Sequence, residues 1–160
     1  MLQVVDQGLL QSESAVLGAL GCLLRSRSAE QARTRLRSRL QSAATPQQQI
    51  EIARVLALSA DPEGRKVLRE LATQPGRARL PAARALAAPD VPEVSDLFRG
   101  VLNNRQAQEA AQLLASQGLG LSGQLLDVRL LDRLLKNGAV ASLKESAAAA
   151  VLQLSAADPT

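Results

Sequence analysis

The charged side chains are the chain's main candidates for chemistry, because its 160 residues include no histidine and only one cysteine. Without an imidazole there is no Ser-His-Asp triad and no histidine metal ligand. Carboxylate pairs such as Glu93 with Asp96, or Asp127 with Asp132, have the residue types of acid–base hydrolysis. Glu93 and Asp96, however, fall in a predicted first helical turn, and Asp132 lies beside arginines of a leucine-rich helix, so both settings suit solvated helix surface. The sequence therefore predicts no enzyme, no catalytic residue, no metal and no cofactor.

A glycine-rich segment, Gly118-Leu-Gly-Leu-Ser-Gly123, matches the letters of the dinucleotide-binding fingerprint. That fingerprint works only between a strand and a helix of a βαβ unit. Residues 106–116 before it are predicted to be helical. We therefore expect a flexible loop at 118–123, with Ser122 or Gly123 capping the following helix.

Basic residues are concentrated in one part of the chain. Residues 25–84 hold 13 Lys or Arg against 5 Asp or Glu, whereas the whole chain has a net charge of +4. If residues 28–43 form a helix, Ala32, Leu36 and Leu40 make its buried stripe and arginines flank this stripe on both sides. The densest run is Arg25, Arg27, Arg33, Arg35, Arg37 and Arg39, and Glu30 is the only acidic residue between them in the sequence.

Three interpretations of this arginine run stay open. The arginines could pair with acids of the same chain, bind an acidic protein partner, or bind nucleic acid or an anionic membrane. The absence of Trp and Tyr disfavours single-stranded nucleic acid, whose bases stack on aromatic rings. Duplex binding through phosphates alone remains an alternative, and it would weaken steeply with salt.

Apolar residues recur at helical spacing almost throughout the chain, and the composition is 46% hydrophobic but 1% aromatic, which favours helix over strand. Start signals support this segmentation: Ser28 with Gln31, Thr45 with Pro46, and Asp61-Pro62-Glu63. The sequence predicts an all-α protein with helices at residues 12–25, 28–43, 46–60, 63–74, 78–88, 91–103, 105–117, 124–137 and 140–156.

The sequence also repeats itself. Residues 51–57 (EIARVLA) align with residues 81–87 (PAARALA) and then with residues 109–115 (EAAQLLA). A less regular copy follows at 147–152. Each copy has a small residue at one position, which lets neighbouring helices approach, and a leucine three residues later, which fills the seam between them. Spacings of about 30 residues indicate stacked helical hairpins. The aligned pairs are Ala53 with Leu56, Ala83 with Leu86, and Ala111 with Leu114.

Residues 78–94 resemble the short bacterial HEAT-like repeat, the type seen in phycobilisome lyases, and residues 50–71 are similar to it. Arg79 occupies the motif's arginine position, although Gln49 and Ala107 stand there in the flanking copies. The resemblance implies a right-handed α-solenoid but says little about function, because such repeats serve many partners. We expect a non-catalytic protein–protein interaction scaffold that binds an acidic segment of a partner. We expect one domain, residues 1–160, with N-terminal capping helices at 1–45, the best-matching repeats at 46–117, a loop at 118–123 and a C-terminal repeat at 124–160. A lyase-like chromophore or small-molecule module is a further alternative.

The repeat register also predicts which residues line the inner face. If Ile50, Ala53 and Leu56 are buried, Gln47 and Arg54 point outward. The resemblance implies that such second helices line the concave face, where solenoids usually bind their partners. A competing interpretation is that Arg54 and Arg84 pair with Asp61, Asp90 or Glu51. The predicted partner-binding residues form one row of Gln47, Arg77 and Arg105 and another of Arg54, Arg84 and Gln112, to which the helix at 28–43 adds Arg33, Arg35, Arg37 and Arg39.

The N-terminal residues bear on location and assembly. Cys22 lies in an apolar run, residues 15–24, where a buried and unreactive thiol is expected. That run is too short to span a bilayer, and Asp6 and Glu13 precede it where a signal peptide would carry Lys or Arg. We therefore expect a cytoplasmic protein with no membrane span. The leucines at positions 9, 10, 17 and 20 could be covered by residues 1–10 or by another chain, and a homodimer through this end is one hypothesis.

Overall fold

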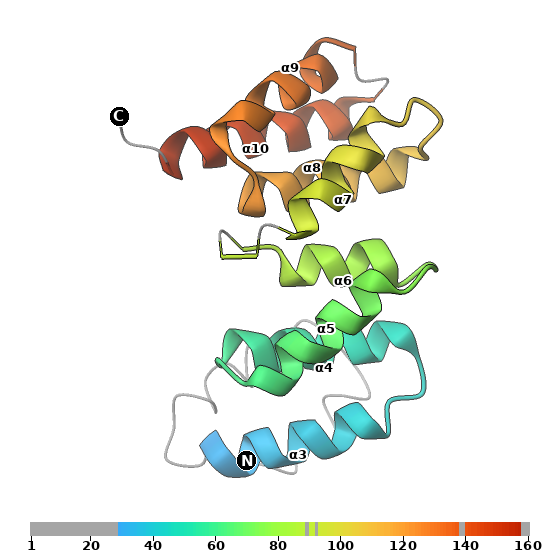
Figure 1. The fold of residues 1–160 in the computed structure, drawn as a ribbon, viewed down its shortest axis with the longest axis vertical. Coiled ribbons are helices and arrows are strands. Elements are labelled where there is room, and N and C mark those ends of the chain that lie inside the picture. Colours follow the sequence, from blue (N-terminus) through green and yellow to red (C-terminus); the bar gives the residue numbers. More distant parts are fainter. Residues whose placement is uncertain (1–28, 89, 92, 138–139, 158–160) are drawn as a thin grey trace. The chain divides into compact units, whose positions relative to one another are not determined.

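The computed structural model describes residues 29–88, 90–91, 93–137 and 140–157, and all regular structure in these ranges is helical (Figure 1). For the described residues the prediction of helical structure without strands is therefore confirmed, and the predicted helices there lie within a few residues of the observed ones. The helix at 12–25, the Ser28 cap, Cys22, Arg25, Arg27 and the proposed dimer end lie outside the described residues. The helices are α3 (Ala29–Gln41), α4 (Pro46–Leu58), α5 (Pro62–Thr73), α6 (Arg79–Leu86), α7 (Glu93–Asn103), α8 (Glu109–Ser122), the short η1 (Leu125–Asp127), α9 (Val128–Asn137) and α10 (Ala141–Ala157).

The chain forms two compact units, residues 1–68 and residues 69–160. Helix α5 begins in the first unit and ends in the second. Within the described part of the chain, no helix is both long and apolar enough to cross a bilayer.

In the first unit, α3 packs on α4 through the stripe expected from the sequence. Ala32, Leu36 and Leu40 are buried, as are Ile50, Ala53 and Leu56 of α4. Helix α4 begins at its predicted cap, because the Thr45 hydroxyl accepts a hydrogen bond from the N–H of Gln48 at 3.2 Å. Helix α5 then approaches α4 at Gly64, where the α4 backbone leaves no room for a side chain.

In the second unit, α8 lies between α6 and α10, while α7 packs on α8 and α9 packs on α10 (Figure 1). Its core includes the fully buried side chains of Phe98 of α7, Leu119 of α8 and Leu131 of α9. A buried hydrogen bond also joins α7 to α8, since the Ser95 hydroxyl donates to the Ser122 carbonyl at 2.6 Å.

Helix α8 corrects two expectations from the sequence. Residues 118–122 were expected to be a loop but form its last turns, and Gly123 ends the helix without capping the next one. The reason is close packing: a Cβ at Gly118 would lie 2.3 Å from the Phe98 ring, and one at Gly120 would lie 2.8 Å from the Ala150 backbone. The buried register shifts accordingly. Ala111 and Leu114 are only half-buried, and Ala115 and Leu119 take the core positions instead.

Candidate functional site

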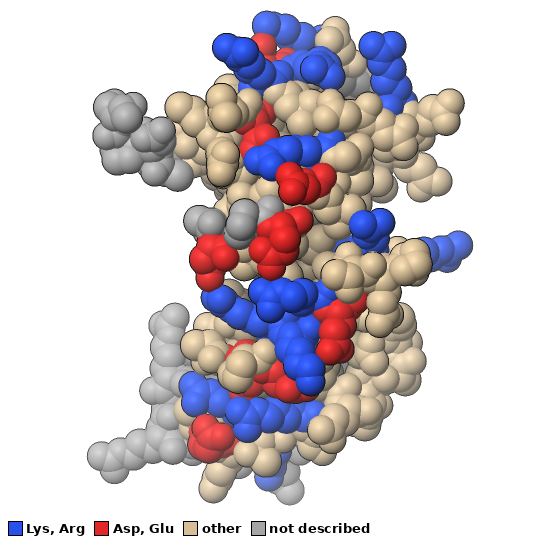
Figure 2. Space-filling model, viewed as in Figure 1, with Lys and Arg blue, Asp and Glu red and all other residues tan. Residues whose placement is uncertain are grey.

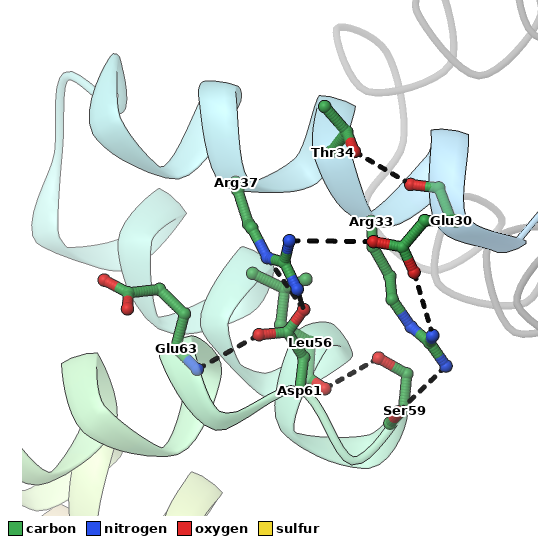
Figure 3. A network of polar contacts seen from close by, with 8 residues as sticks. All are labelled: Glu30, Arg33, Thr34, Arg37, Leu56, Ser59, Asp61 and Glu63. Carbon is green, nitrogen blue, oxygen red and sulfur yellow. Dashed lines mark hydrogen bonds and ion pairs between the residues drawn. The ribbon is translucent and has the colours of Figure 1, made fainter.

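Two of the four described arginines of α3, Arg33 and Arg37, link α3 to the turn between α4 and α5 (Figure 3). Arg37 donates from Nε and pairs through Nη2 with the Asp61 carboxylate, at 3.0 and 2.7 Å. The Asp61 side chain is completely buried, and it also accepts a hydrogen bond from the N–H of Glu63 at the start of α5. The hydrogen bond to Asp61, together with the charge of that carboxylate, raises the pKa of Arg37. Arg33 donates to Glu30 and to the Ser59 carbonyl, at 3.2 and 3.3 Å.

The other two α3 arginines, Arg35 and Arg39, are exposed and half-buried respectively, and neither is without a partner. For Arg33 and Arg37 the structure therefore supports the first of the three interpretations, pairing within the chain. To bind a partner, Arg33 and Arg37 would first have to break these hydrogen bonds within the chain.

A second buried carboxylate, Asp127, plays the corresponding role in the second unit. Arg99 of α7 grips it with two hydrogen bonds, 2.7 Å from Nε to Oδ1 and 2.9 Å from Nη2 to Oδ2. The N–H of Gln124 donates to the same carboxylate at 2.8 Å, which closes a capping box at the start of η1. Burial by itself raises the pKa of Asp127, but these hydrogen bonds and the Arg99 charge outweigh burial, so the pKa is lowered overall.

These contacts form a recurring link that sequence reasoning missed. Arginines of α3, α5 and α7 each pair with an acid at or just before the start of the helix two further along the chain. Anions near a helix start complement the helix dipole. A signal was present, because the arginines at 37, 69 and 99 recur at about the spacing of the sequence repeat. The three pairs are Arg37 with Asp61, Arg69 with Glu93 and Arg99 with Asp127.

The predicted rows are only partly on helices. Gln47 lies exposed in the first turn of α4, and its amide donates to Glu51 at 2.7 Å. Arg77 and Arg105 lie in the turns before α6 and α8, which begin at Arg79 and Glu109. Arg105 was expected to begin its helix, whereas Arg77 was expected just before its own. In Figure 1 both turns lie on the right of the view. Positions 47 and 54 belong to the first unit, and the remaining row positions, including the half-buried Arg84 and Gln112, belong to the second.

Three of the candidate arginines differ from the rest. Within the described residues, Arg54, Arg77 and Arg105 are exposed and make no hydrogen bond or ion pair. The competing expectation that Arg54 pairs with Asp61 or Glu51 is therefore wrong, since Asp61 is held by Arg37 and Glu51 accepts from Gln47. Arg84 has a partner.

The two buried carboxylates of the described residues, Asp61 and Asp127, are already bonded to groups of the same chain. Asp127, which the sequence paired with Asp132, bonds instead to Arg99 and Gln124, while Asp132 pairs with Lys136 at 2.6 Å. The described ranges contain no group of three or more Cys, Asp or Glu side chains that could hold a metal ion. What this set of side chains can offer another molecule is charge and hydrogen bonding at exposed arginines.

Substituting Asp127 with asparagine is expected to lower the free energy of unfolding at neutral pH by about 2 kcal/mol, because the charged hydrogen bonds to Arg99 are lost. The lowered pKa of Asp127 makes the wild-type contribution complete above its ordinary value of 3.8 and progressively lost as the pH falls below it. Urea unfolding from pH 7 down to about pH 2.5 measures both effects. The variant should show a flatter stability profile below pH 5.

The control for this substitution is Asp132→Asn, which removes a carboxylate from an exposed pair with Lys136. Such surface pairs contribute little to stability. If both variants lose the same stability, or if Asp127→Asn keeps the wild-type acid profile, the assigned role of the Arg99 pair is wrong.

Comparison with protein-family models, with curated proteins and with solved structures finds no match to this chain.

Proposed function

We propose that this protein is a non-catalytic interaction scaffold, a right-handed α-solenoid of HEAT-like helical hairpins that binds an acidic segment of a partner protein. The observation that carries the proposal is the exposure of Arg54, Arg77 and Arg105 without a hydrogen bond or ion pair inside the described chain. A guanidinium of this kind can donate paired hydrogen bonds to an incoming carboxylate without first breaking a contact of its own.

The packing of the helices supports a scaffold. In the second unit α8 makes its main contacts with α6, α7 and α10, and α9 makes its main contacts with α10, so these contacts join α-helices that are first or second neighbours along the chain. Contacts limited to near neighbours are typical of repeat proteins, which bind partners along extended surfaces. The buried acids Asp61 and Asp127 serve helix starts and inter-helix pairing, which favours a structural use of these carboxylates over catalysis.

The test compares two triple charge reversals in capture experiments from cell extract. The first variant is Arg54→Glu with Arg77→Glu and Arg105→Glu. Its control reverses three other exposed cations that have no hydrogen bond or ion pair inside the described residues, Lys66, Arg133 and Lys144. Captured proteins are then mapped to their acidic segments, and each segment is measured as a labelled peptide by fluorescence anisotropy.

We expect the first variant to bind such a peptide about tenfold more weakly or worse, and the control to stay close to wild type. Affinity should also fall with salt, because exposed charges are screened. Equal losses in both variants would contradict a specific role of Arg54, Arg77 and Arg105. Tight binding of duplex DNA that is lost in the same variant would favour the nucleic-acid alternative over an acidic protein.

A further inference from the structure

The segment from η1 through α9 exposes an unusual combination of side chains. Leu126 is 80% exposed and Leu125 is 50% exposed, and they are adjacent in the chain. The other large exposed hydrophobic residues of the described chain, Leu58 and Leu152, have no such neighbour. Burying leucine surface is favourable, so this pair is a candidate contact for an apolar environment.

The structure holds these two leucines outward. The residues on either side of them form the capping box, in which Asp127 accepts from the N–H of Gln124 at 2.8 Å. Arg99 fixes the same carboxylate with two further hydrogen bonds. Because buried contacts of Asp127 already fix this turn, moving Leu125 and Leu126 into an apolar environment costs little conformational entropy.

Cations continue from the leucines along the same face of α9. Arg129 and Arg133 are exposed and have no hydrogen bond or ion pair within the described residues. Positions 126, 129, 133 and 136 follow helical spacing and share one side, while Leu131 on the other side is buried. Lys136 pairs with Asp132, and Lys144 and Glu145 of α10 are also exposed. Figure 2 shows Lys and Arg side chains gathered over α9.

We propose that the face formed by Leu125, Leu126, Arg129 and Arg133 docks on an anionic lipid surface. A protruding apolar turn enters the boundary between headgroups and acyl chains without needing a shaped pocket, whereas a folded protein partner would have to provide one. The arginines one and two turns further on meet lipid phosphates in a plane, and each adds electrostatic attraction to a negatively charged leaflet. The contact is peripheral and reversible, and it does not depend on Arg54, Arg77 or Arg105.

The chain contains no Trp or Tyr, so a single introduced tryptophan reports its own surroundings. Leu126→Trp is mixed with vesicles of phosphatidylcholine, or of phosphatidylcholine with about 30% phosphatidylglycerol. Leu58→Trp is the control, because Leu58 is 78% exposed but lies on α4. We expect the tryptophan emission of Leu126→Trp to shift to shorter wavelength with the anionic vesicles and not with phosphatidylcholine alone. Leu58→Trp should show no shift with either. Raising NaCl from about 0.1 to about 0.5 M should reverse the shift of Leu126→Trp.

Co-sedimentation of the full unlabelled chain with the same vesicles provides the second measurement. We expect Leu125→Ser with Leu126→Ser, and separately Arg129→Glu with Arg133→Glu, to lower the partition constant by about tenfold. The matched control, Arg77→Glu with Arg105→Glu, should bind like wild type. Absence of wild-type binding to anionic vesicles overturns the proposal. An equal loss in the matched control also overturns it, since this would indicate attraction by net charge alone. Retention of binding in both the leucine and the arginine variants overturns it as well.

Discussion

Replacing Phe98 with alanine is expected to lower the free energy of unfolding by about 3–5 kcal/mol, the typical cost of removing a buried aromatic ring. Phe98 is the only aromatic residue of the chain and is fully buried in α7. Its ring lies against the backbone of α8 at Gly118, so its removal leaves a cavity between these two helices. Urea unfolding monitored by circular dichroism measures the loss, and Phe98→Leu should cost clearly less because it fills part of that space.

The coupling between Phe98 and Gly118 gives this prediction an internal check. A methyl group at Gly118 would lie 2.3–2.7 Å from three carbons of the ring. Gly118→Ala should therefore destabilise the wild type by about 1–3 kcal/mol, but much less in the Phe98→Leu background, where the ring is gone. If the two substitutions are simply additive, the ring and the glycine do not share this contact.

Replacing Gly64 with alanine is expected to destabilise the first unit by about 3 kcal/mol. A Cβ at Gly64 would lie 2.4 Å from the Ala53 carbonyl oxygen and 2.5 Å from the Ala57 nitrogen. Both atoms belong to the α4 backbone, which cannot rotate away as a side chain can, so α5 would have to move off α4. Hydrogen exchange should consequently accelerate in α4 and α5.

The control for Gly64 is Gly100→Ala, because a Cβ at Gly100 in α7 meets no atom within 4 Å. Alanine is the better helix former by about 1 kcal/mol, so this second substitution should stabilise the protein. Opposite signs for two glycine-to-alanine changes within helices would show that packing, and not helix propensity, decides the effect at Gly64. Equal effects would contradict the close approach of α5 to α4.

Gly118 and Gly120 illustrate how a prediction from local sequence fails when tertiary contacts outweigh helix propensity. Glycines are poor helix formers, so a loop at 118–123 was the reasonable expectation. In the structure α8 continues through them, because the absence of side chains at Gly118 and Gly120 lets it approach Phe98 and α10. The packing compensates for the weak propensity of the glycines.

For the arginines, too, the sequence predicted the helix they lie on but not which of them are paired. Spacing placed Arg33, Arg35, Arg37 and Arg39 on one helix, and the buried stripe of that helix, Ala32, Leu36 and Leu40, is confirmed. Nothing in the local sequence separates Arg37, which is held by the buried Asp61, from Arg54, which has no polar partner in the described chain. That difference depends on contacts between residues 24 positions apart.

The sequence by itself determined that the protein is helical, where most helices begin and end, and which faces of α3 and α4 are buried. These properties follow from periodicity, capping residues and the scarcity of strand formers, all of which act over a few residues. Only the tertiary structure decided the register of α8, the pairing of Arg99 with Asp127 and the outward position of Leu125 and Leu126. Each of these depends on how closely distant helices pack and on which buried charges they bring together, and a pattern within one helix carries no such information.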